Sequence, residues 1–198
     1  KNTFNQLVVA KASLESKFGL RSIECFPFKN NIGFTEDQIP LIENCFVGVR
    51  LLESATDRLK PLIACALYAG LRISELLHLR WKDIDWNTGE LHVVSRREHH
   101  TKNYESRRIP MNDALIEVLR RHPRHIKSPY IFCNKNGQPF KNVRTALRYA
   151  AKRAGIEDHI NIHQLRHAFC SHAQMQGIDP RTVQGWMGHK DITTTLRY

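Results

Sequence analysis

Apolar residues recur at helical spacing along most of this 198-residue chain. The clearest case follows Asp57, where apolar side chains fall at i, i+3, i+4, i+7 and i+8, the pattern of a helix with one buried face. They are Leu59, Leu62, Ile63, Ala66 and Leu67. Gly70 predicts the end of this helix, and a second short helix is expected to begin near Ser74. Residues 142–154 return to helical spacing and end at Gly155.

The beginning of the chain carries weaker signals. Residues 4–19 have apolar positions near helical spacing and stop at Gly19, as a short helix would. The turn-rich stretch 27–33 follows and is typical of a linker. Thr35 and Gln38 then fit the capping box that begins another helix.

The middle of the chain changes from helical spacing to short apolar runs. Residues 91–95 and 107–111 predict two strands on either side of a polar loop that contains Lys102. Residues 130–133, followed by Asn136-Gly137, predict a further short strand and a turn.

Three more helical stretches complete the chain. They cover residues 162–176, residues 180–187 with Asp179 as N-cap and Pro180 in first position, and a segment that starts near Asp191. The predicted fold class is therefore α+β, mostly helical with a small antiparallel sheet.

Composition narrows the function. The chain has 41% apolar and 25% charged residues, no apolar stretch long enough to cross a bilayer and no secretion signal at its start, so we expect it in the cytoplasm. Thirty Lys and Arg against nineteen Asp and Glu give a net charge of +11, which favours a polyanionic partner over an ordinary basic surface. The five cysteines are scattered and form no CxxC pair, so reduced thiols are expected.

The helix predicted over 162–176 places polar side chains on one face: His163, Arg166, His167 and Cys170. A solvated polar face is the simplest interpretation. The i, i+4 spacing of His163 and His167 also fits part of an HExxH zinc motif, but Gln164 stands where that motif has Glu, which argues against zinc.

Three other features are weak when taken singly. Arg72 lies between Gly70 and the expected N-cap Ser74, near a helix start where backbone amides favour an anion, and could equally be a surface residue or a partner of Glu75. Gly188-His189 fits an ordinary turn, and Tyr198 fits an aromatic anchor.

Taken in order, these features resemble a known family. The segments AGLRISELLHLRWKDID (69–85), Thr101-Lys102, HQLRH (163–167) and GHKDITTTLRY (188–198) resemble the motifs of the tyrosine recombinases, or phage integrases. In that family a GLRxSE arginine, a hairpin lysine, HxxR and GH precede a tyrosine nine residues beyond the GH histidine, which is the spacing of His189 and Tyr198. The resemblance implies a mostly helical catalytic domain with a small antiparallel sheet over residues 31–198 that stops at the nucleophilic tyrosine. Residues 1–30 would then be the end of the core-binding domain and its linker.

The resemblance also implies a reaction and a site. The Tyr198 oxygen would attack a DNA phosphodiester, leaving a 3′-phosphotyrosine and a free 5′-hydroxyl, with no metal or nucleotide cofactor. Arg72 and Arg166 would stabilise the negative charge that develops on the phosphate. Lys102 would protonate the leaving oxygen, although a hairpin lysine could instead bind a base or a phosphate. His163 is the candidate base and His189 a phosphate ligand, and the sequence does not separate these two roles.

The function implied is a site-specific integrase that inserts or excises a mobile element, such as a phage genome, in the cytoplasm of a bacterial host. Its partners would be double-stranded DNA, three further copies of itself in a synaptic homotetramer, and candidate accessory DNA-bending proteins; a monomer is the alternative for this fragment alone. Two other interpretations stay open. One is a type IB topoisomerase-like enzyme, and the other is a DNA-binding regulator that has lost the chemistry.

Overall fold

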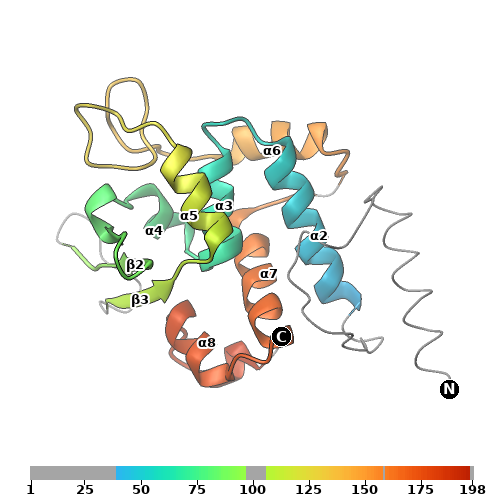
Figure 1. Ribbon diagram of the computed structural model, residues 1–198. Helices are drawn as coiled ribbons and strands as arrows, with labels where there is room; N and C mark the ends of the chain where they lie inside the picture. The colour runs from blue at the N-terminus through green and yellow to red at the C-terminus, as the bar shows by residue number, and fades with distance from the viewer. Residues whose placement is uncertain (1–38, 97–105, 158, 197–198) are drawn as a thin grey trace, which may run out of the picture.

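A computed structural model describes residues 39–96, 106–157 and 159–196 (Figure 1). Its elements, in chain order, are α2 (Ile39–Ser54), α3 (Lys60–Ala69), α4 (Ile73–Leu77), the 3-10 turn η3 (Trp81–Asp83), β1 (Ile84–Asp85), β2 (Glu90–Val93), β3 (Arg107–Pro110), α5 (Asp113–Arg121), α6 (Arg144–Arg153), α7 (Ile162–Met175), α8 (Pro180–Met187) and α9 (Ile192–Thr195). The predicted α+β class, mostly helical with a small antiparallel sheet, is confirmed.

Helix α3 is the centre of the core. It packs against α2, α5 and α7, and all its residues except Lys60 and Tyr68 are buried. Leu62 and Ile63 have no exposed surface, and burying each such side chain contributes about 1.5–3 kcal/mol. The stripe predicted after Asp57 is therefore confirmed, although burial extends around nearly the whole helix.

The sheet is a three-stranded antiparallel meander in the order β1-β2-β3. Leu91 pairs with Ile109, and both side chains are completely buried against the helices. Exposure alternates along β2 and places Leu91 and Val93 on the inner face. Burial of that face fixes the strand register, and so fixes where β3 begins.

Some of the secondary structure differs from the prediction. Strand β1 was not expected, so the sheet has one strand more than the two predicted around the polar loop. Residues 130–133 form no strand; Tyr130 and Cys133 make only isolated bridges, to Arg80 and Pro139. Helix α5 was not predicted, although Leu115 and Leu119 are buried at i, i+4 on one side of it and its charged residues lie on the other. It is held by Asn112, whose side chain caps the backbone N–H of Leu115 at 2.9 Å.

The polar face of α7 is not a solvated surface. Arg166 is only 2% exposed and Cys170 is fully buried, so the simplest interpretation of that face is wrong at these two positions. Gln164 completes a capping box with Asn161: each side chain accepts from the other residue's backbone N–H, at 2.8 and 3.0 Å. Its side chain therefore serves the start of the helix.

Several predictions lie outside the described residues: the helix over 4–19, the linker 27–33, the capping box at Thr35, and the two site residues Lys102 and Tyr198. Within the part of the chain that the structure describes, no helix is both long enough and apolar enough to cross a membrane.

Candidate active site

Two helices end beside each other and supply the framework of the site. Helices α3 and α8 both stop at a glycine in the left-handed region, Gly70 at φ 60° and Gly188 at φ 62°. A helix C-terminus leaves carbonyl oxygens without intrahelical partners and carries partial negative charge, which favours cations. The residues on either side of these glycines are the GLR and GH motifs of the sequence.

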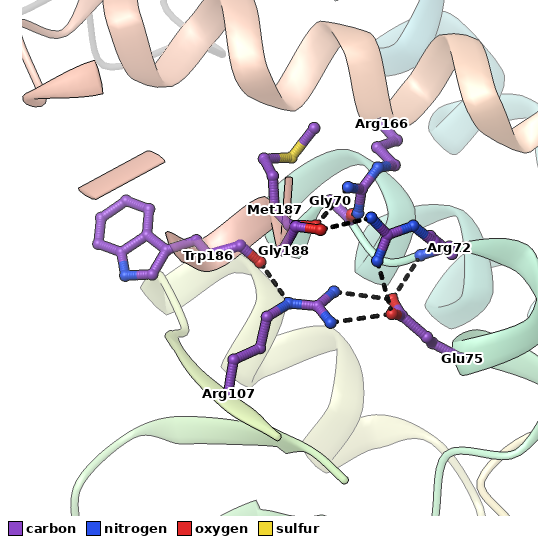
Figure 2. A network of polar contacts seen from close by, with 8 residues as sticks. All are labelled: Gly70, Arg72, Glu75, Arg107, Arg166, Trp186, Met187 and Gly188. Carbon is purple, nitrogen blue, oxygen red and sulfur yellow. Dashed lines mark hydrogen bonds and ion pairs between the residues drawn. The ribbon is translucent and has the colours of Figure 1, made fainter. Parts of the chain in front are cut away.

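Arg166 joins the two helix ends. From α7 its Nη1 donates to the carbonyl of Gly70 and its Nη2 to the carbonyl of Met187 (Figure 2). Burial, together with repulsion from Arg72 and Arg107, lowers the pKa of Arg166 to about 9. The guanidinium therefore stays charged at neutral pH, buried among cations and carbonyl dipoles.

Arg72 lies at the start of α4 and faces the same centre. Its Nη2 donates to the carbonyl of Gly188 at 2.7 Å, and its Nη1 to Glu75 Oε1 at 3.1 Å. The predicted pairing with Glu75 is confirmed, whereas the predicted N-cap at Ser74 is wrong because Arg72 itself occupies that position. The Arg72 side chain is 21% exposed, so it reaches solvent where Arg166 does not.

Sequence reasoning missed one charged residue of this centre, Arg107, and named Glu75 only as a partner of Arg72. Arg107, the first residue of β3, donates through Nη1 and Nη2 to the two oxygens of Glu75, both at 2.8 Å, and through Nε to the carbonyl of Trp186 at 2.6 Å. Glu75 follows Arg72 by one helical turn, a spacing that signals an ion pair. No pattern in the strand sequence marks Arg107, because only the fold brings it to the end of α8.

We call Arg72, Glu75, Arg107 and Arg166 the arginine centre. Three successive carbonyls at the end of α8, those of Trp186, Met187 and Gly188, each accept from a different arginine. Burial opposes the charge on Glu75, but hydrogen bonds and attraction from Arg107 and Arg72 outweigh it and lower its pKa. Three guanidiniums against one carboxylate leave two positive charges in excess, which is the electrostatics of an anion site.

His189 lies at the edge of the arginine centre. Its Nδ1 is 2.9 Å from Thr195 Oγ1 in α9, and the side chain of Gln184 donates to its carbonyl at 3.1 Å. Burial first, and then the charges of Arg166 and Arg72, lower the pKa of His189 to about 4. Its imidazole is therefore neutral at pH 7.

His163 and His167 lie one turn apart at the start of α7. Their ring centroids are 4.1 Å apart in an edge-to-face arrangement. Burial, His163 and Arg166 lower the pKa of His167 to about 4, so it too is neutral at pH 7. His163 is exposed to solvent, one turn before Arg166 on the same helix.

Four of the six predicted site residues thus lie in the described structure, and Arg72 and Arg166 meet at the end of α8 with His189 beside them. Lys102 belongs to the connection between β2 and β3, and Tyr198 follows α9 by three residues. Thr195, the last residue of α9, is fully buried, and its carbonyl accepts from Gln174 of α7 at 2.6 Å. The chain is therefore anchored on α7 just before Tyr198.

Comparison with known proteins identifies the family and agrees with this fold. Residues 34–198 match the phage integrase family. A tyrosine recombinase from Thermosipho africanus is 32% identical over 167 residues, which are 83% of this chain and 55% of that protein. Tyrosine recombinase XerC from Staphylococcus epidermidis is 37% identical over 142 residues, covering 67% of this chain and 46% of that protein.

Solved structures give the same result for the fold. The crystal structure of XerA recombinase superposes with a TM-score of 0.67 at 23% identity, covering 98% of this chain and 70% of that one. The Tn1549 transposon integrase in complex with a circular intermediate DNA gives a TM-score of 0.63 at 24% identity, covering 87% and 62%. The chain belongs to the phage integrase family and has the tyrosine recombinase fold. It spans about half the length of the curated relatives it matches.

Proposed function

We propose that this chain is the catalytic part of a site-specific DNA recombinase that breaks and rejoins strands through a 3′-phosphotyrosine. The observation that carries the proposal is the arginine centre, where three guanidiniums converge on the end of α8 and two of them share one carboxylate. A phosphodiester gains negative charge on its non-bridging oxygens as it is attacked, and donors already fixed at that position lower the barrier. Arg72 and Arg166 are the proposed phosphate ligands.

The reaction exchanges one ester for another. Tyr198 Oη forms a bond to phosphorus as the bond from phosphorus to the 5′ oxygen breaks, and the tyrosine proton leaves to a base. Lys102 gives a proton to the departing 5′ oxygen, so the products are a phosphotyrosine and a 5′-hydroxyl. Because the phosphoester bond is kept, the reverse attack by a 5′-hydroxyl reseals the strand.

The two site histidines receive different proposed roles. His189 carries no charge at pH 7 and lies beside both arginines, so it serves as a neutral hydrogen-bond donor to the phosphate. His163 is exposed at the start of α7, where it can accept a proton from an incoming group such as Tyr198. The base role needs a neutral imidazole before the reaction, whereas a hydrogen bond to the phosphate can be donated by the neutral ring that His189 has at pH 7.

Helix α6 supports duplex DNA as the partner. Arg144, Arg148 and Lys152 follow each other at i, i+4 and i+8, and all three are exposed on one side of the helix. Such a row of cations matches a phosphate backbone, so DNA binding should weaken steeply as salt is raised. In Figure 1, α6 lies at the end of the molecule opposite α8.

The wider assignment extends this proposal. The protein would integrate or excise a mobile element in a bacterial cytoplasm and act as a homotetramer on two duplexes, with accessory DNA-bending proteins as candidate partners. Residues 31–198 would form the catalytic domain, and residues 1–30 the end of a core-binding domain. The support is family membership and the names of relatives that are themselves recombinases and integrases.

The test is trapping of the covalent intermediate. Nicked duplexes tiled across the DNA that flanks the protein's gene are incubated with the full-length protein in EDTA, and adducts are separated on a denaturing gel and mapped by mass spectrometry. We expect an adduct on Tyr198 that is absent in Tyr198→Phe. Site-specific binding without any adduct would favour the regulator interpretation, and relaxation of any supercoiled plasmid would favour the topoisomerase interpretation.

A further inference from the structure

Arg107 is the most fully engaged guanidinium of the arginine centre. All three of its guanidinium nitrogens donate, two to Glu75 and one to the carbonyl of Trp186. Its side chain is 11% exposed, and it passes so close to Gly188 that a Cβ there would lie 3.3 Å from Nη1. Three of the five N–H groups of Arg107 are therefore committed within the protein, against two in the bonds of Arg166 to Gly70 and Met187.

Glu75 is shared unequally between its two arginines. Arg107 meets both carboxylate oxygens at 2.8 Å in the parallel, two-bond geometry that is strongest for this pair. The side chain of Arg72 reaches the same carboxylate through a single contact of 3.1 Å. The negative charge of Glu75 is thus compensated mainly by Arg107, and Arg72 keeps more of its positive charge for another anion.

We propose that Arg107 is a positioning residue: it neutralises Glu75 and fixes the end of α8, so that the charges of Arg72 and Arg166 remain available to the phosphate. This inference rests on the proposed function and adds to the same site a residue that does not itself touch the phosphate. Because Arg107 begins β3, the same contacts hold the base of the connection in which Lys102 lies.

Loss of Arg107 has a predictable consequence. Glu75 would keep its charge in a buried position, with Arg72 as its only remaining arginine partner in the centre. The two would form a closer pair, so that Arg72 would be partly neutralised and a carboxylate would face the incoming phosphate. The carbonyl of Trp186 would also lose its donor.

Four variants of the full-length protein separate this role from a general loss of folding. Arg107→Gln removes the charge, and Arg107→Lys keeps it without the two-bond geometry. The double variant Arg107→Gln/Glu75→Gln also removes the uncompensated carboxylate. Arg108→Gln is the matched control, because Arg108 is the next residue of the same strand. Its side chain is 71% exposed, and its ion pair, from Nη1 to Glu90 Oε2, is long at 3.7 Å. Circular dichroism and thermal melting check that each variant is folded.

Two quantities are measured for each variant: the single-turnover rate of adduct formation at saturating nicked duplex, and the dissociation constant for tungstate, a phosphate-like dianion, by calorimetry. We expect Arg107→Gln to slow the reaction and weaken tungstate binding by on the order of 10- to 100-fold, the size typical of losing an orienting partner. The rate and the tungstate affinity of Arg107→Lys should lie between those of Arg107→Gln and of the unchanged protein. Both quantities should be the same in Arg108→Gln as in the unchanged protein.

The double variant gives the decisive comparison. We expect it to recover on the order of tenfold over Arg107→Gln in both measurements, as coupled charges do. A role confined to packing predicts the opposite, since a second change in a buried site would add to the loss. A double variant no better than Arg107→Gln would overturn the proposal.

The two readouts also separate this proposal from the proposed function. If the unchanged protein binds tungstate but forms no adduct on any duplex, the recombinase assignment fails and Arg107 is judged by tungstate alone. If the protein forms the adduct and Arg107→Gln reacts as fast, only the Arg107 proposal fails. If neither tungstate binding nor an adduct is found, both are wrong.

Discussion

The protein holds arginines in two regions by opposite means. In the arginine centre, guanidiniums converge on helix carbonyls and one carboxylate (Figure 2). Around η3 and α5, arginines instead lie separately over aromatic rings, and we call this region the aromatic side. Its pairs are Arg80 over Tyr130 at 5.2 Å, Arg120 over Trp86 at 5.7 Å and Arg124 over Trp81 at 4.5 Å.

The two regions differ in whether the arginine charges are kept apart or brought together. On the aromatic side each guanidinium lies over its own ring, which contributes about 0.5–1 kcal/mol at an exposed site and does not bring one cation close to another. Bringing three cations together costs free energy that only well-placed acceptors can offset, and the two helix ends provide them. An abundance of arginine therefore does not make an anion site, whereas convergence on carbonyls does.

Arg166→Met is expected to have the largest effect, because it removes a buried donor and leaves the carbonyls of Gly70 and Met187 without it. The single-turnover rate should fall by on the order of 100- to 1,000-fold or more. Arg124→Met on the aromatic side is the matched control, and it should leave the rate within about twofold. Equal losses of rate in Arg166→Met and Arg124→Met would show that the convergence of arginines on helix carbonyls has no special role in the reaction.

Gly70→Ala should destabilise the helix end that supports the centre. A Cβ at Gly70 would clash with Phe169 Cδ1 and lie 2.9 Å from Met187 Sδ, at a φ of 60°. The combined cost of backbone strain and overpacking is about 2–5 kcal/mol. Gly177→Ala separates the two causes, because Gly177 has a φ of 74° but no atom within 4 Å of the added Cβ. It should lose only about 1–2 kcal/mol in urea unfolding.

Acid should destabilise the protein through the histidines beside the arginine centre. The folded-state pKa values of His167 and His189 are about 4, against an ordinary value of 6.5, so the unfolded chain binds more protons between these limits. Stability is then fully present above pH 6.5 and falls as the pH is lowered toward 4. Glu75 acts in the same direction at lower pH: because its pKa is lowered in the folded state, its stabilisation is present above its ordinary pKa of 4.5 and is lost at more acidic pH.

Urea unfolding between pH 7.5 and 4.5 measures this dependence. His189→Asn should flatten the decline, because it removes one of the groups that the unfolded chain protonates. His125→Asn is a suitable control on the aromatic side, where the histidine is bonded to the carbonyl of Lys135 away from the centre. A decline that is unchanged in His189→Asn would mean that the site does not control the acid sensitivity.

The smallest effect is expected on α6. Arg148→Gln should weaken DNA binding by roughly the contribution of one phosphate contact and reduce the slope of log K against log salt by about one. The single-turnover rate at saturating DNA should not change. Fluorescence anisotropy at several salt concentrations tests this, and an unchanged slope would remove Arg148 from the interface.

The sequence predicts the elements that carry a strong local signal. The stripe in α3, the Asp179-Pro180 start of α8 and the terminating glycines Gly70, Gly155 and Gly177 are found in the structure, because each depends on neighbours a few residues away. Arg72 and Arg166 could be picked out by their motifs. Arg107 could not, since its partners lie 32 and 79 residues away and only the completed sheet brings them together. The buried state of Arg166 was missed for the same reason.

The long reach of these contacts bears on when the site can form during synthesis of the chain. Arg166 joins Gly70 across 96 residues, and Arg72 joins Gly188 across 116. A nascent chain that has emerged only as far as α6 has its basic surface but no assembled cationic centre. In the proposed recombinase, the phosphate site would therefore form only after α8 has been synthesised and docked. The order of translation would then delay DNA cleavage until this part of the chain is made.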